Sequence, residues 1–312
     1  MHAKLFTPFR PLCPYETCSL ELRDSALLSE GPKTRPIVRY GRFRRANDSR
    51  LISRFRCMSC RRTFSNATRS PCFGQKKRTI NSTVESLLAS NMSQRRIALV
   101  LGINLKTVAR KLLFLAAQAK RERLNYIEQL KSREQPLHSF QFDEMETFER
   151  SKCLPLSIPL VVLAGSRKIL GFRVCEMPAN GPLAAISKRK YGKRKDERAQ
   201  AARALLAEIQ AVFAEKVKIT TDQNPKYPGW LKLHFPKAQH ETFKGRRGCV
   251  VGQGELKKIG FDPLFSLNHT CAMLRYGINR LARRTWSTTK KRECLEAHLE
   301  LYIHFHNRRL TG

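Results

Sequence analysis

Two short apolar runs in this chain each end on an aspartate, and this pair constrains the fold more than any other feature. Residues 139–142 lead into Asp143, and residues 217–221 lead into Asp222. Such short, strand-like runs predict that each carboxylate stands at the end of a β-strand. The two carboxylates lie side by side only if their strands are neighbours in one sheet, which the order of the predicted strands permits.

The chain is strongly basic, which limits its partners. Its 312 residues include 60 Lys and Arg against 25 Asp and Glu, a formal net charge of +35. Cations spread over the whole length are typical of a protein that binds duplex nucleic acid, although charge alone also fits a ribosomal or membrane-surface binder. Carboxylates at strand ends in so basic a chain are candidates for holding a metal ion against a polyanion. The pair therefore indicates phosphoryl chemistry on nucleic acid.

Length and apolar content predict a globular protein of two or three domains, since 41% of the residues are hydrophobic. The longest apolar stretch, 154–165, contains Pro155 and Pro159 and is too short to span a bilayer. The first residues lack the apolar core of a secretory signal. We therefore expect a cytoplasmic protein with no membrane partner, in which the cysteines are reduced.

The period of the hydrophobic pattern changes along the chain and predicts three domains. Residues 1–75 form a small β-rich module, and residues 78–135 have a helical period that fits three helices and a charged connector helix. Residues 137–312 predict an α/β fold, a mixed sheet with flanking helices. Its expected strands are 138–149, 156–164, 168–176, 217–222 and 238–243, and its expected helices are 199–215, 228–235, 264–283 and 291–307. The basic insert 188–198 is expected to be a solvated loop, with phosphate contact as the alternative.

Two pairs of cysteines predict a zinc ribbon in the first domain. Cys13 and Cys18 are spaced C-x4-C, and Cys57 and Cys60 are spaced C-x2-C. Such pairs bring four thiolates around one Zn²⁺ ion, and a small domain with few apolar residues needs that cross-link. Four thiolates leave no open position, so the metal is expected to be structural. Cys72 remains a possible substitute ligand, and ordinary buried thiols are the other alternative.

Residues 91–112 predict a helix-turn-helix. Ser93 can cap a first helix, Gly102 permits the turn, and Asn104 can cap a second helix that begins at Leu105. The second helix would present four polar side chains to the major groove of DNA, namely Lys106, Thr107, Arg110 and Lys111. The alternative is an αα-hairpin packed inside a larger fold.

Several segments resemble bacterial insertion-sequence DDE transposases. They are residues 142–148 around the first aspartate, residues 221–224 around the second, and the late basic segments 263–275 and 279–286. A zinc ribbon followed by a helix-turn-helix is also the front end of the small insertion-sequence families. The resemblance implies an RNase H-like catalytic domain that cuts transposon ends and joins them to target DNA. It also implies Mg²⁺ or Mn²⁺ as the catalytic metal, held by Asp143, Asp222 and a third ligand.

The third ligand is where the sequence departs from most of that group. Asn268 stands where most members carry Glu, as in the subset described as using an Asp-Asp-Asn set. An amide oxygen can ligate Mg²⁺ but brings no charge, so weaker metal binding or an inactive copy is also compatible. Glu255, in a Gly-rich stretch, is the other candidate. Arg275, two helical turns after Asn268, and then Arg280 are expected to contact DNA.

These features together predict a DNA transposase that binds the ends of an insertion sequence and catalyses strand cleavage and strand transfer. Its expected partners are double-stranded DNA, both element ends and target, and further copies of itself on that DNA, in the cytoplasm and associated with the nucleoid. Two alternatives stay open. One is a catalytically inactive, transposase-derived zinc-ribbon regulator, and the other is a structure-specific nuclease of the same fold. The inverted-repeat sequence and the target preference are not encoded in any feature above.

Overall fold

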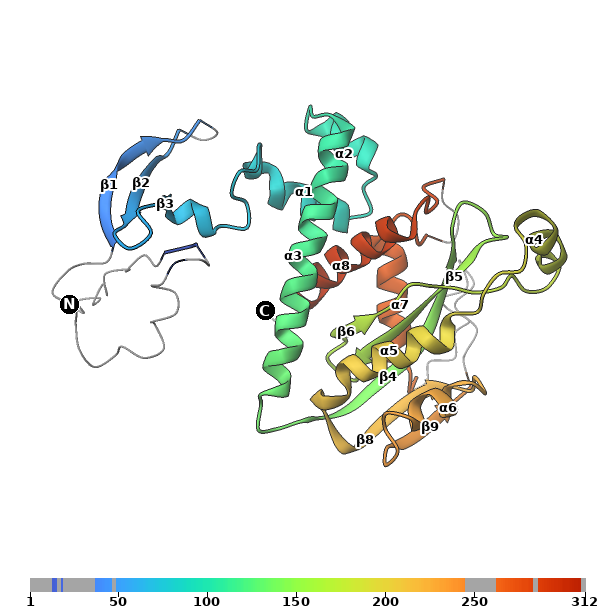
Figure 1. Cartoon of the computed structure of the whole chain (residues 1–312). Coiled ribbons are helices and arrows are strands. Elements are labelled where there is room, and N and C mark those ends of the chain that lie inside the picture. Colours follow the sequence, from blue (N-terminus) through green and yellow to red (C-terminus); the bar gives the residue numbers. More distant parts are fainter. Residues whose placement is uncertain are drawn as a thin grey trace. The chain divides into compact units, whose positions relative to one another are not determined.

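The computed structural model of the chain describes residues 13–15, 18, 37–46, 49–244, 262–282 and 286–309 (Figure 1). It divides into two compact units, residues 1–81 and residues 82–312. The first unit ends close to the predicted limit of the zinc ribbon. The predicted helical segment and the predicted sheet lie in one compact unit, so their division into separate domains stays a prediction.

The first unit contains a three-stranded antiparallel sheet in the order β1-β2-β3. The strands are β1 (Ile37–Arg44), β2 (Leu51–Cys57) and β3 (Thr63–Ser65), followed by the 3₁₀ helices η1 (Asn66–Arg69) and η2 (Arg78–Ile80). Among the residues described in this unit, three cysteines and one aromatic ring form a buried cluster: Cys13, Cys18, Cys57 and Phe64. Few apolar side chains are buried among these described residues, so a cross-link through the cysteines would add to their stability.

Three helices open the second unit: α1 (Asn81–Ala89), α2 (Gln94–Val100) and α3 (Leu105–Lys131). Both predicted caps are present, because Ser93 Oγ accepts from Arg96 N at 3.3 Å and Asn104 Oδ1 accepts from Lys106 N at 2.8 Å. Gly102 has a φ of +57°, so it supplies the left-handed turn between α2 and α3. Two helices joined by a short turn are therefore present with the predicted caps, and the second helix continues without a break into the predicted connector.

A mixed sheet in the order β6-β5-β4-β8-β9 forms the centre of this unit. Its strands are β4 (Leu137–Phe148), β5 (Pro155–Leu163), β6 (Ile169–Phe172), β8 (Phe213–Asp222) and β9 (Gln239–Phe243), with the short β7 (Cys175–Glu176) paired to β5. The pairs β4–β5 and β5–β6 are antiparallel, whereas β4–β8 and β8–β9 are parallel. The predicted α/β class and mixed sheet are confirmed at this level.

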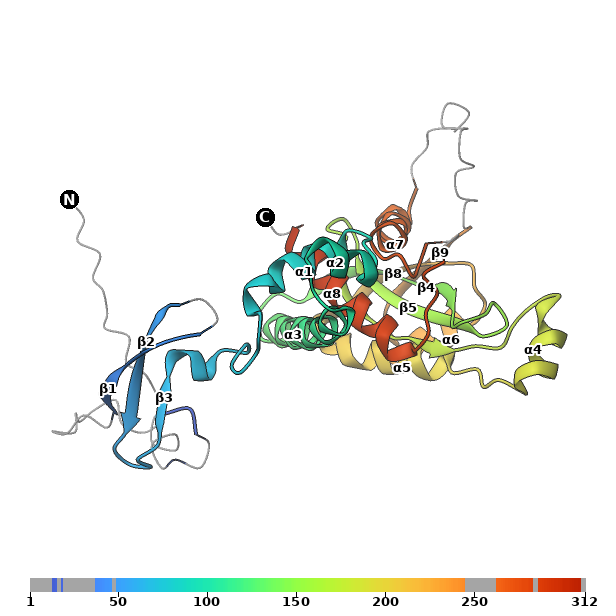
Figure 2. The same cartoon turned by 90° about the horizontal axis from the view of Figure 1, so that it is seen from above.

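Helices cover both faces of the sheet (Figure 2). On one face, α5 (Arg198–Ile209), α6 (Tyr227–Lys232) and the second half of α3 bury the main core, in which Phe140 and Phe142 of β4 take part. Side chains alternate along a strand, so Gln141 and Asp143 point to the opposite face, where α7 (Phe265–Gly277) lies. The last helix, α8 (Arg292–Arg309), packs against α3.

A buried arginine joins α3 to the sheet. Arg123 of α3 donates two hydrogen bonds to Glu300 of α8, both at 3.0 Å, and one to Glu208 of α5 at 2.8 Å. It also reaches the carbonyl oxygen of Leu170 on β6. Because a buried guanidinium is stable only when fully paired, this contact set fixes α3 relative to the sheet.

Several predicted boundaries were wrong. The helix predicted at 199–215 ends at Ile209, and β8 begins at Phe213, because that ring packs against Phe140 in the core. The basic insert contains a helix, α4 (Leu183–Tyr191), rather than only a loop. The helix predicted to end at residue 283 ends at Gly277, and Trp286 is fully exposed.

Candidate metal and nucleic-acid sites

The parallel pairing of β4 and β8 aligns the two aspartates. Phe140 pairs with Ile219 and Gln141 with Thr220, so the same register carried on by two residues sets Asp143 opposite Asp222. Residues at equal register on adjacent strands point to the same face, here the face covered by α7. The predicted neighbourhood of the two strands is thus present. Asp222 ends β8 as predicted, but Asp143 does not end its strand, because β4 stays paired with β5 as far as Phe148.

Asp143 is held by hydrogen bonds to a single carboxylate oxygen. Its Oδ1 accepts from the hydroxyl of Tyr227 at 2.9 Å and from the backbone N–H of Glu144 at 2.7 Å. Burial raises the pKa of Asp143 to about 6, and the negative charge of Asp222 raises it as well, while the two hydrogen bonds act in the opposite sense. The carboxylate is therefore in a place where a cation would be favoured.

The turn after Asp222 completes this arrangement. Asp222 Oδ1 accepts from Asn224 N at 3.0 Å, and Asn224 Oδ1 in turn accepts from Lys226 N at 3.1 Å. These local bonds shape the turn that leads into α6, and α6 supplies the hydroxyl of Tyr227 to Asp143. The turn therefore begins at Asp222 and leads into α6, whose Tyr227 orients Asp143.

The start of α7 is fixed to the strand that carries Asp143. Gln141 Oε1 accepts from Leu267 N at 2.8 Å, and its Nε2 donates to the carbonyl oxygen of Pro263 at 2.7 Å. Ser266 Oγ also accepts from Gly165 N at 3.0 Å, which ties the helix to the turn between β5 and β6. The buried Gln141 thus acts as a clamp between strand and helix.

Asn268 lies on this helix, but its side chain is hydrogen-bonded to Asp262 and not to Asp143 or Asp222. Its side chain is exposed, and its Nδ2 donates to Asp262 Oδ2 at 3.0 Å. Cys271, one turn further along α7, is close enough to Asp143 for that charge to add to the effect of burial in raising the thiol pKa. The helix therefore passes the acidic pair, with Asn268 at its exposed side. The alternative ligand Glu255 lies outside the described residues.

Sequence reasoning missed two residues that build this site, Gln141 and Tyr227. Gln141 precedes Asp143 by two positions, so strand alternation alone puts both side chains on one face. That signal was available in the sequence. Tyr227 gave no such signal, because its contact with Asp143 depends on the path of the chain after Asp222.

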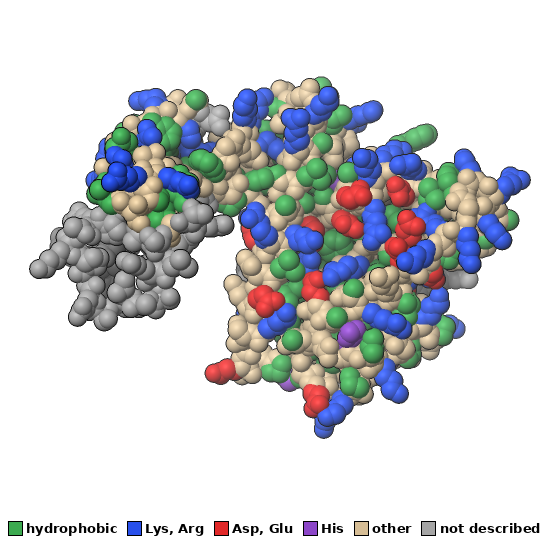
Figure 3. Space-filling model, in the orientation of Figure 1, with side chains coloured by type: hydrophobic (Ala, Val, Ile, Leu, Met, Phe, Trp, Pro, Cys, Tyr) green, Lys and Arg blue, Asp and Glu red, His purple; other side chains and the backbone are tan. Residues whose placement is uncertain are grey.

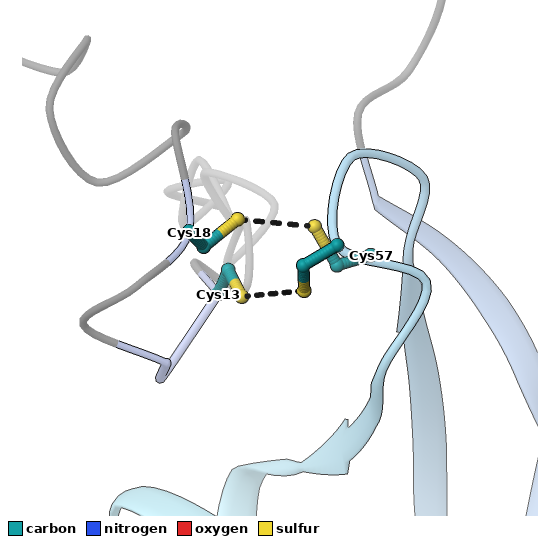
Figure 4. Close-up of side chains that lie close together, drawn as sticks. Cys13, Cys18 and Cys57 are labelled. Atoms are coloured by element: carbon teal, nitrogen blue, oxygen red, sulfur yellow. Dashed lines mark hydrogen bonds between the residues drawn. The ribbon is translucent and has the colours of Figure 1, made fainter.

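The four predicted zinc ligands form one cluster. The Sγ atoms of Cys13, Cys18, Cys57 and Cys60 all lie within 4.8 Å of one another. Cys13 and Cys60 are 3.7 Å apart and Cys18 and Cys57 are 3.6 Å apart, close to the edge of about 3.8 Å of a tetrahedron with zinc–sulfur bonds of about 2.3 Å. Figure 4 shows the sulfur atoms of Cys13, Cys18 and Cys57 turned toward one another.

This cluster can hold a structural zinc ion. Burial raises the pKa of the Cys13 thiol to about 12, so a cation is needed to keep such thiols as thiolates. Cys72 is not part of the cluster, and its sulfur instead accepts from Asn81 Nδ2 at 3.5 Å. Among the described residues, no other group of three or more His, Cys, Asp or Glu side chains is close enough to hold a metal ion.

The recognition-helix prediction needs one correction. Lys106 and Arg110 are exposed and Thr107 is half-buried, as a DNA-facing surface requires. Lys111, in contrast, is only 3% exposed and is not available to the major groove. Position 111 shares the inward face of α3 with Val108 at i−3, so helical geometry buries the lysine stem in the packing.

The two late arginines differ in position. Arg275 is half-buried on the last turns of α7, two helical turns beyond Asn268. Arg280 was expected on the same helix, but it follows the helix end. Burial lowers the pKa of Arg280, and its charge contributes to lowering the pKa of the buried His298 on α8. Arg280 is therefore close enough to α8 for its charge to act on His298.

No protein-family model matches the chain, and no curated protein matches it significantly. The described helices include none that is long and apolar enough to cross a membrane.

Proposed function

We propose that this protein is a DNA transposase with an RNase H-like catalytic domain, a zinc ribbon and a helix-turn-helix. The observation that carries the proposal is the shared register of Asp143 and Asp222 on adjacent parallel strands, beside a helix that carries Asn268. The mixed sheet with helices on both faces is the architecture expected for an RNase H-like domain. The charge of +35 supports a polyanionic substrate.

Each residue of the site has a defined role in this proposal. Asp143, Asp222 and Asn268 offer the oxygen ligands that Mg²⁺ or Mn²⁺ prefers. When bound, the metal activates the attacking water or 3′-hydroxyl and stabilises the leaving oxygen. Tyr227 orients Asp143 through a hydrogen bond to Oδ1, which leaves Oδ2 for the metal. Because the pKa of Asp143 is about 6 without metal, the carboxylate is ionised at neutral pH.

DNA recognition is divided between modules in this proposal. Lys106, Thr107 and Arg110 at the start of α3 read the element ends, and the zinc ribbon adds a second contact. Arg275 lies on the helix beside the acidic pair and contacts the phosphate backbone near the reacting bond. The protein acts as a homo-oligomer on duplex DNA in the nucleoid.

The test requires the ends of the element. The DNA that flanks the coding sequence is searched for inverted repeats bracketed by a short direct duplication, and a labelled duplex containing one repeat serves as substrate. Asp143→Ala and Asp222→Ala should each abolish cleavage and joining in Mg²⁺ while binding of the end is kept. Cleavage by either variant at the wild-type rate would show that the substituted aspartate is not a catalytic residue.

The third ligand is tested with the same substrate. Asn268→Ala should reduce cleavage severely, whereas Asn268→Asp should keep activity, because it replaces a neutral oxygen ligand with a charged one. Glu255→Gln should have a mild effect. An inactive Glu255→Gln beside an active Asn268→Ala would make Glu255 the ligand.

One observation favours the regulator as a second candidate. Asn268 is exposed and hydrogen-bonded to Asp262 instead of to either aspartate. A regulator would bind the element ends through α3 without nicking them in Mg²⁺ or Mn²⁺. Cleavage without joining would instead identify a nuclease. In every case Arg110→Ala should weaken binding to the ends more than to random duplex, and equal losses on both would remove the recognition role of α3.

A further inference from the structure

A basic arm, residues 183–195, projects between β7 and α5 (Figure 1). It consists of α4 and the segment that returns to α5. All of its charged residues are cations: Lys188, Arg189, Lys190, Lys193, Arg194 and Lys195. Figure 3 shows Lys and Arg side chains gathered over α4, at the right of the view. The helix-turn-helix, the zinc site and the acidic pair do not account for this concentration of charge.

Contacts with the rest of the unit hold the basic arm at its middle and at its C-terminal end. Ser187 is buried, and its Oγ donates to the carbonyl oxygen of Cys153 at 2.7 Å. Arg194, with a side chain only 9% exposed, forms an ion pair with Glu176 of β7 at 3.4 Å. The backbone N–H of Glu197 donates to the carbonyl oxygen of Glu176 at 3.0 Å. The arm is therefore held at a defined place.

The helix of the arm is unusual because almost no part of it is packed. Ser187 is its only buried residue, while Ile186 and Tyr191 are 44% and 43% exposed. A short helix with one buried side chain and adjacent like charges is not stable through its own contacts. A polyanion along the exposed side would remove the repulsion between the cations and supply the missing contacts.

The acidic residues at the base of the arm are already neutralised. Asp196 pairs with Arg198 at 2.7 Å, and Glu197 pairs with Arg292 at 3.1 Å. In contrast, Lys188, Arg189 and Lys190 are exposed and have no ion pair with any acidic residue that the structure describes. The surplus positive charge is thus concentrated on the helix itself.

Strand register locates the arm relative to the acidic pair. In β5, Leu160 pairs with Asp143, and Ser157 pairs with both Glu146 of β4 and Cys175 of β7. Arg194 at the end of the arm pairs with Glu176, the last residue of β7, and Glu176 pairs with Leu156 of β5, the partner of Thr147 of β4. The base of the arm therefore lies four residues beyond Asp143 along β4, about 13 Å at about 3.3 Å per residue, and two strands to the side. Duplex DNA carries one charge per about 1.7 Å of its axis, so a duplex at the acidic pair presents phosphates over this distance.

We propose that the basic arm binds the phosphate backbone of the DNA duplex whose reacting phosphate lies at Asp143 and Asp222. This inference rests on the proposed function. Lys188, Arg189 and Lys190 make sequence-independent contacts that fix the duplex on the sheet edge, separate from base reading by α3. Because such contacts release counterions, their loss is visible in the salt dependence of binding.

The experiment uses the full chain with Asp143→Asn, so that DNA is not cut. Lys188→Gln, Arg189→Gln and Lys190→Gln are combined in an arm variant, because Gln keeps helix propensity and removes charge. The matched control removes the three cations Lys131, Arg133 and Lys216, which lie near the starts of β4 and β8 at the opposite end of the sheet. Affinity for a random duplex is measured as a function of salt concentration.

Three lost phosphate contacts should make the slope of log K against log salt shallower by about 2.7, which corresponds to an affinity loss of up to about 500-fold at 0.1 M salt. The control should keep the slope of the parent. Hydrogen exchange of the amides of residues 183–195 should slow when duplex is added to the parent protein. Equal slopes for arm variant and control, or exchange that duplex does not change, would overturn the proposal.

Three further outcomes separate this proposal from the proposed function. If the parent binds duplex normally and the arm variant binds equally well, only the arm assignment fails. If the arm variant lowers the salt slope on single-stranded RNA and not on duplex DNA, the arm assignment also fails and its partner is RNA. If the slope changes as expected but wild-type protein never cleaves an element end, the arm assignment stands while the transposase proposal fails.

Discussion

Replacing Asp143 with asparagine should stabilise the metal-free protein, although it removes a proposed metal ligand. Both hydrogen bonds to the side chain end on Oδ1, and an asparagine Oδ1 can accept them from Tyr227 and from Glu144 N–H in the same way. What changes is the charge. Burial raises the pKa of Asp143 from an ordinary value of 3.8 to about 6, so the ionised form is disfavoured in the folded protein.

The magnitude follows from linkage between protonation and folding. A carboxyl whose folded-state pKa is raised contributes most to stability below about pH 4, and this contribution is lost as the pH rises to about 6. A shift of about two units corresponds to at most about 3 kcal/mol above pH 6. For a compact unit of the size of residues 82–312, this free energy corresponds to a rise in Tm of up to about 6–12 °C for Asp143→Asn at pH 8. At pH 4 the Tm should hardly change.

The assay is thermal unfolding at pH 4, 6 and 8 in buffer without Mg²⁺, and without a chelator that would remove zinc from the cysteine cluster. Glu146→Gln, an exposed carboxylate on the same strand, is the control and should change Tm little at any pH. Added Mg²⁺ should raise the Tm of the wild type and not that of the variant. An Asp143→Asn protein that is less stable than the wild type at pH 8, or equally shifted at all three pH values, would refute the reasoning.

Three further predictions concern the rest of the molecule. The purified protein should contain about one Zn²⁺ per chain by elemental analysis, which Cys57→Ser should release and Cys72→Ser should not; a metal-free protein with a folded first unit would contradict this. Arg123→Ala should lower the free energy of unfolding by about 3–5 kcal/mol in denaturant titrations, because it leaves Glu300 buried and unpaired. Arg121 is exposed on the same helix, so the control Arg121→Ala should change the free energy of unfolding by less than about 0.5 kcal/mol. His304 lies 3.0 Å from Glu85 and 2.7 Å from Glu122, and the hydrogen bond to Glu85 raises the pKa of His304. The stability that this contact adds should be complete below about pH 6.5 and should fall as the pH rises through the raised pKa. His304→Gln should abolish this pH dependence of stability, and Arg308, which also acts on Glu85, should not produce it.

The features that were predictable from the sequence are those that depend on residues close together in the chain. Ser93, Gly102 and Asn104 fix the helix-turn-helix because capping and left-handed turns are local effects. The C-x2-C pair likewise predicts a local turn that brings two cysteines together, and the apolar run before Asp222 predicts a strand that ends there. The same prediction for Asp143 was wrong, because β4 continues to Phe148. Lys111 shows the limit of this reasoning, because its type suggested a DNA contact while its position on the inward face of α3 buried it.

Tertiary structure decided everything that required distant segments to meet. The partnership of β4 with β8 put the two aspartates at one register, and neither run of sequence contains that pairing. Gln141 clamps α7, Tyr227 orients Asp143, and Arg123 joins three helices, each through contacts between residues far apart in the chain. The sequence by itself determined the local elements and their chemical groups, because their energies depend on near neighbours. The charged state and the surroundings of Asp143 came only from folding, because burial exists only once distant segments have closed around it.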